Sequence, residues 1–363
     1  MKRHQLLARS DFDRFLGSLQ QLQVAKDLIQ SEEPEKARMA IILLHSLADG
    51  LMFSAAIAAF EHDLFFARIL PPKYPAPDRS KVLRYFDEKV KFCREKIKLL
   101  SVADATIFKI LNFYRNAAYH RDIHNPRVVL PIAGIAFRST LRLFRQGIIK
   151  GDGFIRPAME SLTRAQAASV KGFCKVDRLI DYDNASKEAV QLLRKGIRLR
   201  LRQVRSAFLD DVKARLARLK RMEKESLYCD SRKQFDELLK KAAFEMKGIE
   251  ETLFSEIRQL RYRILGKVPG GKPSREEYLG AEGRYEKTLK MAFKSFRTDI
   301  TAATIDHIER KLLSLQRTTS LEGTLSDYLA IDKRLVEVEV LALHAERRID
   351  EAIQVRIDLE RGK

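Results

Sequence analysis

The stretch MAIILLHSLADGLMFSAAIAAF, residues 39–60, decides the fold. It is long and apolar enough to cross a bilayer, but His45 and Asp49 lie near its middle. An aspartate at that depth costs about 2.5–3.5 kcal/mol on insertion scales. We therefore expect a buried helix in a soluble bundle with no membrane contact. The alternative, a membrane-associated protein, would use this same segment.

Helical periodicity extends on both sides of this segment. Four prolines between residues 70 and 80 exclude a helix there, and Pro126 forces another break. Ser80 and Ser101 are placed to cap the helices that follow them. The pattern predicts a compact bundle of about five helices within residues 1–150, at residues 10–31, 35–69, 80–100, 101–120 and 130–146.

The rest of the chain has longer helical patterns. After a helical linker at residues 151–185, we expect helices of about 35 to 45 residues, where the globular norm is about 11. They cover residues 186–228, 231–265, 274–316 and 325–359. In the last one, apolar residues alternate spacings of four and three, which is typical of a coiled-coil seam: Ile331, Leu335, Val338, Ala342, Ala345, Ile349 and Ala352. We predict an all-α protein whose residues 186–363 form long antiparallel or coiled-coil helices.

The charge balance favours an anionic partner. The chain has 69 Lys and Arg against 49 Asp and Glu, a formal net charge of +20. Nucleic acid is the commonest partner of a soluble basic chain, and charge kept only for solubility is the alternative. Cys93, Cys174 and Cys229 form no C-x-x-C pair, which fits a reducing compartment. No signal-peptide pattern opens the sequence, so we expect a cytoplasmic protein.

The segment from Arg115 to His120 is the strongest candidate for chemistry. An imidazole can move the 2′-hydroxyl proton of RNA near neutral pH, and a guanidinium can stabilise charge on the scissile phosphate without any metal. Five residues of ideal helix advance about 7.5 Å and leave the two side chains about 140° apart. Either the helix unwinds at His120, or two copies of the chain complete each other's sites.

The helix ARMAIILLHSLADGLMFSAAIAA, followed by a helix that ends in FYRNAAYHRDIHNP and by a further apolar helix, resembles HEPN domains. The resemblance covers residues 35–147. It implies a small helical bundle whose R-x4-6-H motif is the active site of metal-independent ribonucleases in toxin, abortive-infection and CRISPR systems. It also implies a homodimer, with an antitoxin or regulator as a possible partner.

The resemblance gives roles to four residues. Arg115 would stabilise the transition state, His120 would act as general base or acid, and Asn116 would orient the pair. Asp49 stands where many members carry a supporting Glu. Position 122 is Asp, not the Tyr of HEPN toxins paired with minimal nucleotidyltransferases. An inactive HEPN relative that serves only as a dimer interface remains the alternative.

A second basic feature runs through residues 194–221. Arg194, Arg198, Arg202 and Arg205 follow helical spacing, so on one continuous helix they would line one face and could follow an RNA backbone. A solvated face paired with acids of a neighbouring helix explains the same pattern.

No metal or cofactor is expected. His120 and His124 are four residues apart, but Arg121 replaces the glutamate of an H-E-x-x-H zinc motif. The sequence thus predicts a homodimeric, metal-independent endoribonuclease. A non-catalytic helical adaptor that binds RNA or a protein is the alternative function.

Overall fold

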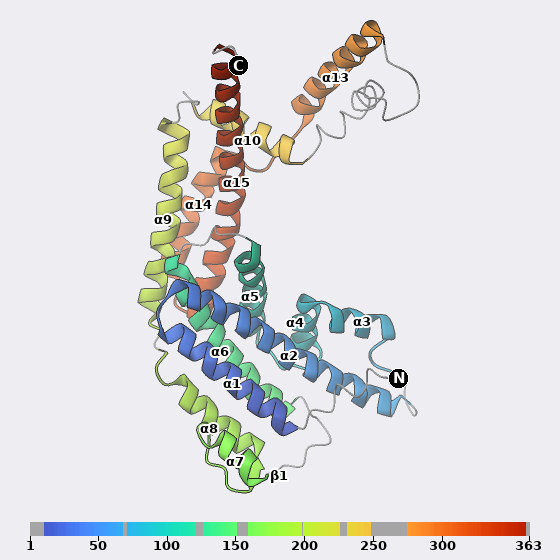
Figure 1. The fold of residues 1–363 in the computed structure, drawn as a ribbon, viewed down its shortest axis with the longest axis vertical. Coiled ribbons are helices and arrows are strands. Elements are labelled where there is room, and N and C mark those ends of the chain that lie inside the picture. Colours follow the sequence, from blue (N-terminus) through green and yellow to red (C-terminus); the bar gives the residue numbers. More distant parts are fainter. Residues whose placement is uncertain are drawn as a thin grey trace. The chain divides into compact units, whose positions relative to one another are not determined.

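The protein is all-α (Figure 1), as the sequence predicts. The computed structural model describes residues 11–67, 71–120, 126–150, 159–197, 199–225, 231–247 and 274–360. The chain forms two compact units. Unit 1 consists of Met1–Asp211 and Leu315–Leu329, and unit 2 consists of Val212–Ser314 and Ala330–Lys363. The division falls after Asp211, whereas the sequence analysis places its boundaries at residues 150 and 185.

Unit 1 contains most of the helices. They are α1 (Asp11–Gln30), α2 (Pro34–Phe66), α3 (Ala76–Arg84), α4 (Phe86–Glu95), α5 (Val102–His120), α6 (Pro126–Lys150), α7 (Arg164–Val170) and α8 (Tyr182–Arg194). Two short strands, β1 (Met159–Ser161) and β2 (Leu179–Asp181), form an antiparallel ribbon in which Glu160 pairs with Ile180. Part of the segment predicted as a helical linker, residues 151–185, is therefore this ribbon.

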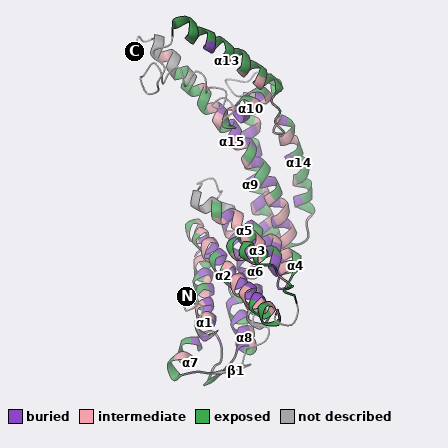
Figure 2. Cartoon of the chain, turned by 90° about the vertical axis from the view of Figure 1, so that its right-hand side faces the viewer, coloured by how far each residue is buried: buried purple, intermediate pink, exposed green. Residues whose placement is uncertain are grey.

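Unit 2 contains α10 (Arg232–Met246) and α13 (Arg275–Ser295). Three further helices have residues in both units: α9 (Leu201–Glu225), α14 (Ala302–Arg317) and α15 (Leu321–Glu360). In Figure 2 the exposed residues, in green, follow α13 along most of its length, whereas buried residues recur along α1, α2 and α6.

The apolar stretch at residues 39–60 lies within α2, at the centre of unit 1. Helices α1, α4, α5 and α6 pack against it, and its buried residues include Ile41, Leu44, Met52 and Phe60. By length and composition α2 could also cross a membrane, although 56% of its most apolar window is buried in the protein. The packing supplies the apolar environment that the sequence of α2 requires.

The predicted helix at residues 80–100 is wrong in its bounds. Helix α3 begins at Ala76, inside the proline-rich segment, with Pro75 and Pro77 at its N-terminus, where proline is well tolerated. Tyr85 then takes an extended conformation and separates α3 from α4. Ser80 lies inside α3 and is not its cap. Ser101 does cap α5, because its Oγ accepts the Asp104 N–H at 3.0 Å.

The predicted helix at residues 186–228 is also wrong, because it is two helices. Helix α8 ends at Arg194, and Gly196 has φ +97°, a conformation that other residues rarely adopt. Helix α9 begins only at Leu201. Arg194 therefore does not lie on the same helix as Arg202 and Arg205, and the predicted continuous arginine face is not formed.

Two further long helices differ from expectation. Residues 274–316 contain α13 and α14, separated at Phe296–Thr301, where the Thr298 and Thr304 hydroxyls accept backbone N–H groups of Ile300 and Thr301. Helix α10 ends at Met246, and most of the rest of predicted helix 231–265 lies outside the described residues. Among the helices that the structure describes, only α15, with 40 residues, matches the expected length.

The seam predicted along α15 is largely buried within unit 2. Ile331, Leu335, Val338 and Ala342 are each at most 2% exposed. Ile349 is half-buried, and the side chain of Ala352 lies outside the described residues. An ion cluster accompanies the seam: Arg215 of α9 donates to Asp332 at 2.5 Å and to Glu339 at 2.7 Å.

Candidate active site

Arg115 lies in the last turns of α5, half-buried in unit 1. Its Nη1 donates a hydrogen bond of 2.9 Å to Oδ1 of the neighbouring Asn116, whose side chain is exposed. The structure thus brings together two of the four residues that the sequence assigns to the site. The amide oxygen fixes one edge of the guanidinium.

His120 is the last residue of α5, so the helix does not unwind before it. Its side chain lies outside the described residues, as do residues 121–125, which include Asp122 and His124. On a continuous helix the two side chains project about 140° apart around the axis. Because α5 extends to His120, the structure does not show the unwound helix that was one of the two expected arrangements. A site shared between two copies of the chain stays a prediction.

Asp49 lies on α2 and contacts α4. Its Oδ1 is 2.7 Å from Nζ of Lys89, whose side chain is only 5% exposed, whereas that of Asp49 is 37% exposed. A buried ammonium ion requires such a carboxylate, because leaving it alone in an apolar interior is costly. Asp49 thus stabilises Lys89 and does not stand alone as a supporting acid.

His45, one turn before Asp49 on α2, is the imidazole that the structure places near Arg115. It is 8% exposed, and its ring stacks on Phe86 of α4 with centroids 4.3 Å apart. Its Nε2 lies 3.1 Å from Oδ1 of Asn112, which is one turn before Arg115 on α5. Because a carbonyl oxygen only accepts, Nε2 carries the proton in this bond.

The hydrogen-bond chain continues to α4. Asn112 Nδ2 donates to Asp87 Oδ1 at 3.4 Å. His45, Asn112 and Asp87 therefore connect α2, α5 and α4 through polar side chains. Arg115 follows Asn112 by three residues, so both lie on the same face of α5. The hydrogen-bond chain holds this face in place.

Electrostatics keep His45 neutral. Burial lowers the pKa of His45 below its ordinary value of 6.5, and the charges of Arg115 and Lys89 lower it further. The hydrogen bond to Asn112 and the charge of Asp49 act in the opposite direction. A buried imidazole that stays neutral beside Arg115 and donates from Nε2 to Asn112 is suited to hold α2 against α5, so His45 positions the cluster.

Sequence reasoning did not assign His45, Lys89 or Asn112 to the site. Two signals could have found them. His45 and Asp49 are the ionisable residues of the apolar stretch 39–60 and share one face because they are four apart. Asn112 precedes Arg115 by three residues, so both lie on one face of α5. Lys89 gave no such signal, since nothing in the sequence distinguishes it from Lys91 on the same helix.

The predicted RNA-binding arginines lie in three different settings. Arg194 ends α8 and Arg202 lies on α9, and both are exposed. Arg205 donates from Nη1 to the carbonyl oxygens of Gln316 at 2.6 Å and Thr318 at 3.1 Å, so it caps the C-terminal end of α14. Arg198 lies outside the described residues.

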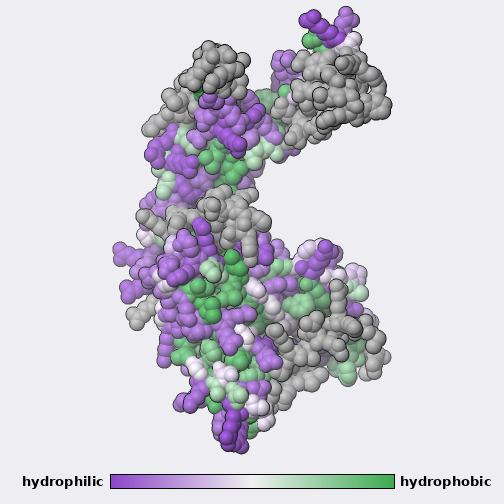
Figure 3. All heavy atoms as spheres, in the orientation of Figure 1, coloured by the Kyte–Doolittle hydropathy of each residue, from purple (hydrophilic) through white to green (hydrophobic). Residues whose placement is uncertain are grey.

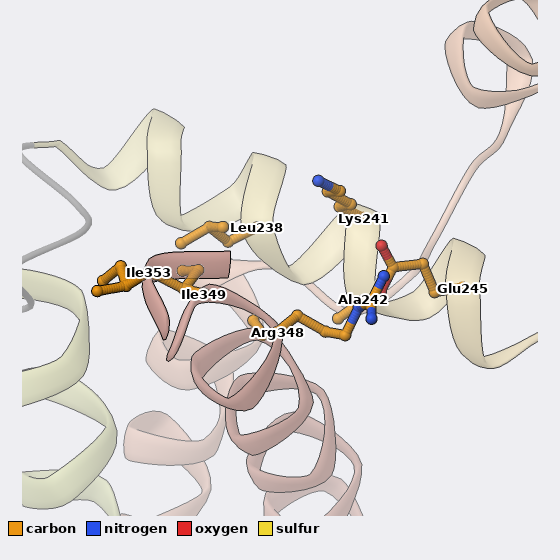
Figure 4. Close-up of a pocket in the computed structure, with 8 residues that line it drawn as sticks. Leu238, Lys241, Ala242, Glu245, Arg348, Ile349 and Ile353 are labelled. Carbon is orange, nitrogen blue, oxygen red and sulfur yellow. The ribbon is translucent and has the colours of Figure 1, made fainter. Parts of the chain in front are cut away.

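A groove in unit 2 is a weaker candidate for a site (Figure 4). It lies between α10 and the C-terminal part of α15, and its apolar lining comes from Leu238, Ile349 and Ile353. At its rim Glu245 lies 3.5 Å from Arg348 and also accepts from His344 at 3.0 Å, so this carboxylate is already engaged. Lys241 is the other charged residue of the lining.

The described residues contain no group of three or more His, Cys, Asp or Glu side chains arranged to hold a metal ion. Cys93 and Cys174 are buried thiols, and burial raises the pKa of Cys93 to about 12 and that of Cys174 to about 11. Neither thiol is a nucleophile at neutral pH.

Comparisons with known proteins assign no relative: no family model, curated protein or solved structure matches the chain. The resemblance to HEPN domains therefore stays a prediction.

Proposed function

We propose that the chain is a metal-independent endoribonuclease that acts as a homodimer. The observation that supports this most is the setting of Arg115. It is a half-buried guanidinium, held by Asn116 on a face of α5 that the His45–Asn112 bond fixes. The net charge of +20 agrees with an RNA substrate.

The proposed reaction is an attack of the 2′-hydroxyl of RNA on the adjacent phosphate. His120 takes the hydroxyl proton, and Arg115 stabilises the negative charge that develops on the phosphate. The bond to the 5′-oxygen of the next nucleotide breaks, and that oxygen receives a proton. The products are a 2′,3′-cyclic phosphate and a 5′-hydroxyl.

The experiment is a cleavage assay on total RNA in EDTA. We expect wild type to cut and Arg115→Ala and His120→Ala to lose at least about a hundredfold in rate, the scale of a general acid or base. His45→Gln keeps a side-chain N–H for Asn112 but no titrating ring, so we expect it to retain cutting. Equal activity of all four proteins would reject the proposal, as would cutting that needs His45 and not His120.

The second candidate function is a non-catalytic adaptor whose helices bind a partner. Arg205 favours it, because this predicted RNA contact is bonded to the end of α14. An adaptor predicts no cyclic phosphate ends in the assay, even when the protein binds RNA. Defence or toxin activity would follow only from the nuclease.

A further inference from the structure

Arg138 on α6 is a cation in an unusual setting within unit 1. Its side chain is half-buried, and it makes no hydrogen bond or ion pair in the part of the chain that the structure describes. Desolvation of a charge is costly unless an opposite charge compensates it. Arg138 is therefore a cation that a bound anion would stabilise.

The neighbours of Arg138 increase this cost. Arg142 lies one turn further along the same face of α6, and like charges at this spacing repel. The pKa of Arg138 is lowered by burial first, then by the charges of Arg194 and Arg142. Arg194, at the end of α8, is thus close enough to act on Arg138, in agreement with the packing of α8 against α6.

The segment between α8 and α9 crosses α6 next to this group. Leu199 lies over Gly134, where an added Cβ would come within 2.8 Å of Leu199 Cδ2. Gly134 is one turn before Arg138 on α6. The close approach at Gly134 therefore brings the segment after Arg194 to the same face of α6 as Arg138.

Two acids are nearby, and Arg142 uses both. Its Nε and Nη2 donate to Asp104 Oδ1 at 2.9 and 2.5 Å, and its Nη2 lies 3.8 Å from Glu322. Glu322 also partly offsets the repulsion at Arg138. Asp104 is buried and fully engaged, with its Oδ2 accepting from Ser101. The charges of Arg138 and Arg194 remain without an acid partner among the described residues.

We propose that Arg138 and Arg194 bind a phosphate group of single-stranded RNA, with Arg142 held beside them by Asp104. The proposal rests on the proposed function, for which it names a surface of unit 1 that holds the substrate. Two guanidinium groups from α6 and α8 can share one phosphodiester, and their mutual repulsion is relieved when the anion is bound. Binding through the backbone carries no base preference.

The test is RNA binding by fluorescence anisotropy, with a short labelled single-stranded RNA in EDTA and with Arg115→Ala in every protein to prevent cleavage. We expect Arg138→Gln and Arg194→Gln each to weaken binding by about three- to tenfold. The slope of log affinity against log salt should fall by about 0.7 for each lost phosphate contact to a single strand. Glu322→Gln should strengthen binding, because it removes the nearby negative charge.

The matched control is Arg164→Gln, an exposed arginine at the start of α7 that loses the same charge. We expect it to bind RNA like the Arg115→Ala parent. Arg138→Gln should also unfold at the same temperature as the parent or higher, since it removes repulsion. Loss of binding together with a lower unfolding temperature would indicate a structural role and reject the proposal.

Other outcomes overturn it as well. If Arg138→Gln binds RNA as tightly as the parent, or if Arg164→Gln weakens RNA binding as much as Arg138→Gln does, RNA is attracted by the overall positive charge. Either result rejects the proposed site. Calorimetry can also measure whether pyrophosphate binds. If Arg138→Gln loses pyrophosphate binding but keeps its affinity for RNA, the site binds a small phosphorylated ligand and not RNA. Because no cleavage is measured, failure here is separate from failure of the nuclease proposal.

Discussion

His45 is the residue that links the candidate site to the core. One side of its ring stacks on Phe86, and its Nε2 bonds to Asn112, so α2, α4 and α5 meet at this ring. The buried His45 would cost free energy without a partner, and Asn112 supplies one. Asn112 in turn bonds to the exposed Asp87.

The neutral state of His45 predicts how stability depends on pH. The pKa of His45 lies below 6.5 in the folded protein. On acidification His45 therefore binds a proton in the unfolded chain at a higher pH than in the folded protein. Stability is therefore retained above pH 6.5 and falls as the pH drops toward the folded-state pKa, with a slope of at most about 1.4 kcal/mol per pH unit. Thermal unfolding of wild type and His45→Gln checks this. The wild-type unfolding temperature should fall more steeply in that window, and parallel curves would contradict the prediction.

At this scale the sequence predicted a contact within one helix and missed contacts between helices. Arg115 and Asn116 were assigned together and do bond to each other. Lys89 could not have been predicted as the partner of Asp49, because the pairing depends on how α4 packs against α2. Spacing along one helix is visible in a sequence, and contacts between helices are not.

At the scale of elements, Gly196 determines where α8 ends and the chain turns. A residue with a Cβ at φ +97° costs about 1–2 kcal/mol, and the Cβ would also contact the Gln30 side chain. We expect Gly196→Ala to destabilise the protein by that amount in urea unfolding. Gly17→Ala is the control, because a Cβ there meets nothing within 4 Å in the middle of α1. It should be neutral or stabilising by up to about 1 kcal/mol.

The ion cluster between α9 and α15 makes a second prediction at this scale. Asp332 is 1% exposed and lies 2.5 Å from Arg215. Arg215→Met should destabilise unit 2 by about 3–5 kcal/mol, because it removes the cation that the carboxylates of Asp332 and Glu339 both contact. The triple variant Arg215→Met, Asp332→Leu, Glu339→Leu should recover most of this loss in urea unfolding. A triple variant as unstable as the single one would show that the cluster contributes net stability.

Some predicted elements failed where no proline marks a break, and α3 begins inside the segment whose prolines were expected to exclude a helix. The sequence placed α2 and α5 to within a few residues, because proline, serine and apolar periodicity agree there. Tyr85 separates α3 from α4 without a strong local signal. Gly196 is such a signal for the end of α8, because glycine with positive φ is common just past helix C-termini, and the predicted helix at residues 186–228 did not use it.

At the scale of the whole molecule, the positive net charge affects how two copies of the chain associate. On the face shown in Figure 3, hydrophilic side chains cover much of the described surface, with apolar patches between them. A net charge of +20 disfavours association of two copies at low salt. RNA that neutralises both copies would offset this repulsion, so the proposed dimer should be more stable with RNA bound.

A mixing experiment tests whether two copies share one site. If Arg115 of one copy acts with His120 of the other, neither Arg115→Ala nor His120→Ala has an intact site alone. A mixed dimer of the two variants has one intact pair and one pair that lacks both groups. Random mixing makes about half of the dimers mixed, and each mixed dimer has one intact site of two because the dimer is two-fold symmetric. The mixture should therefore regain about a quarter of wild-type activity. Two separately active sites within single chains would give no recovery, and sedimentation equilibrium of the mixture confirms that dimers are present.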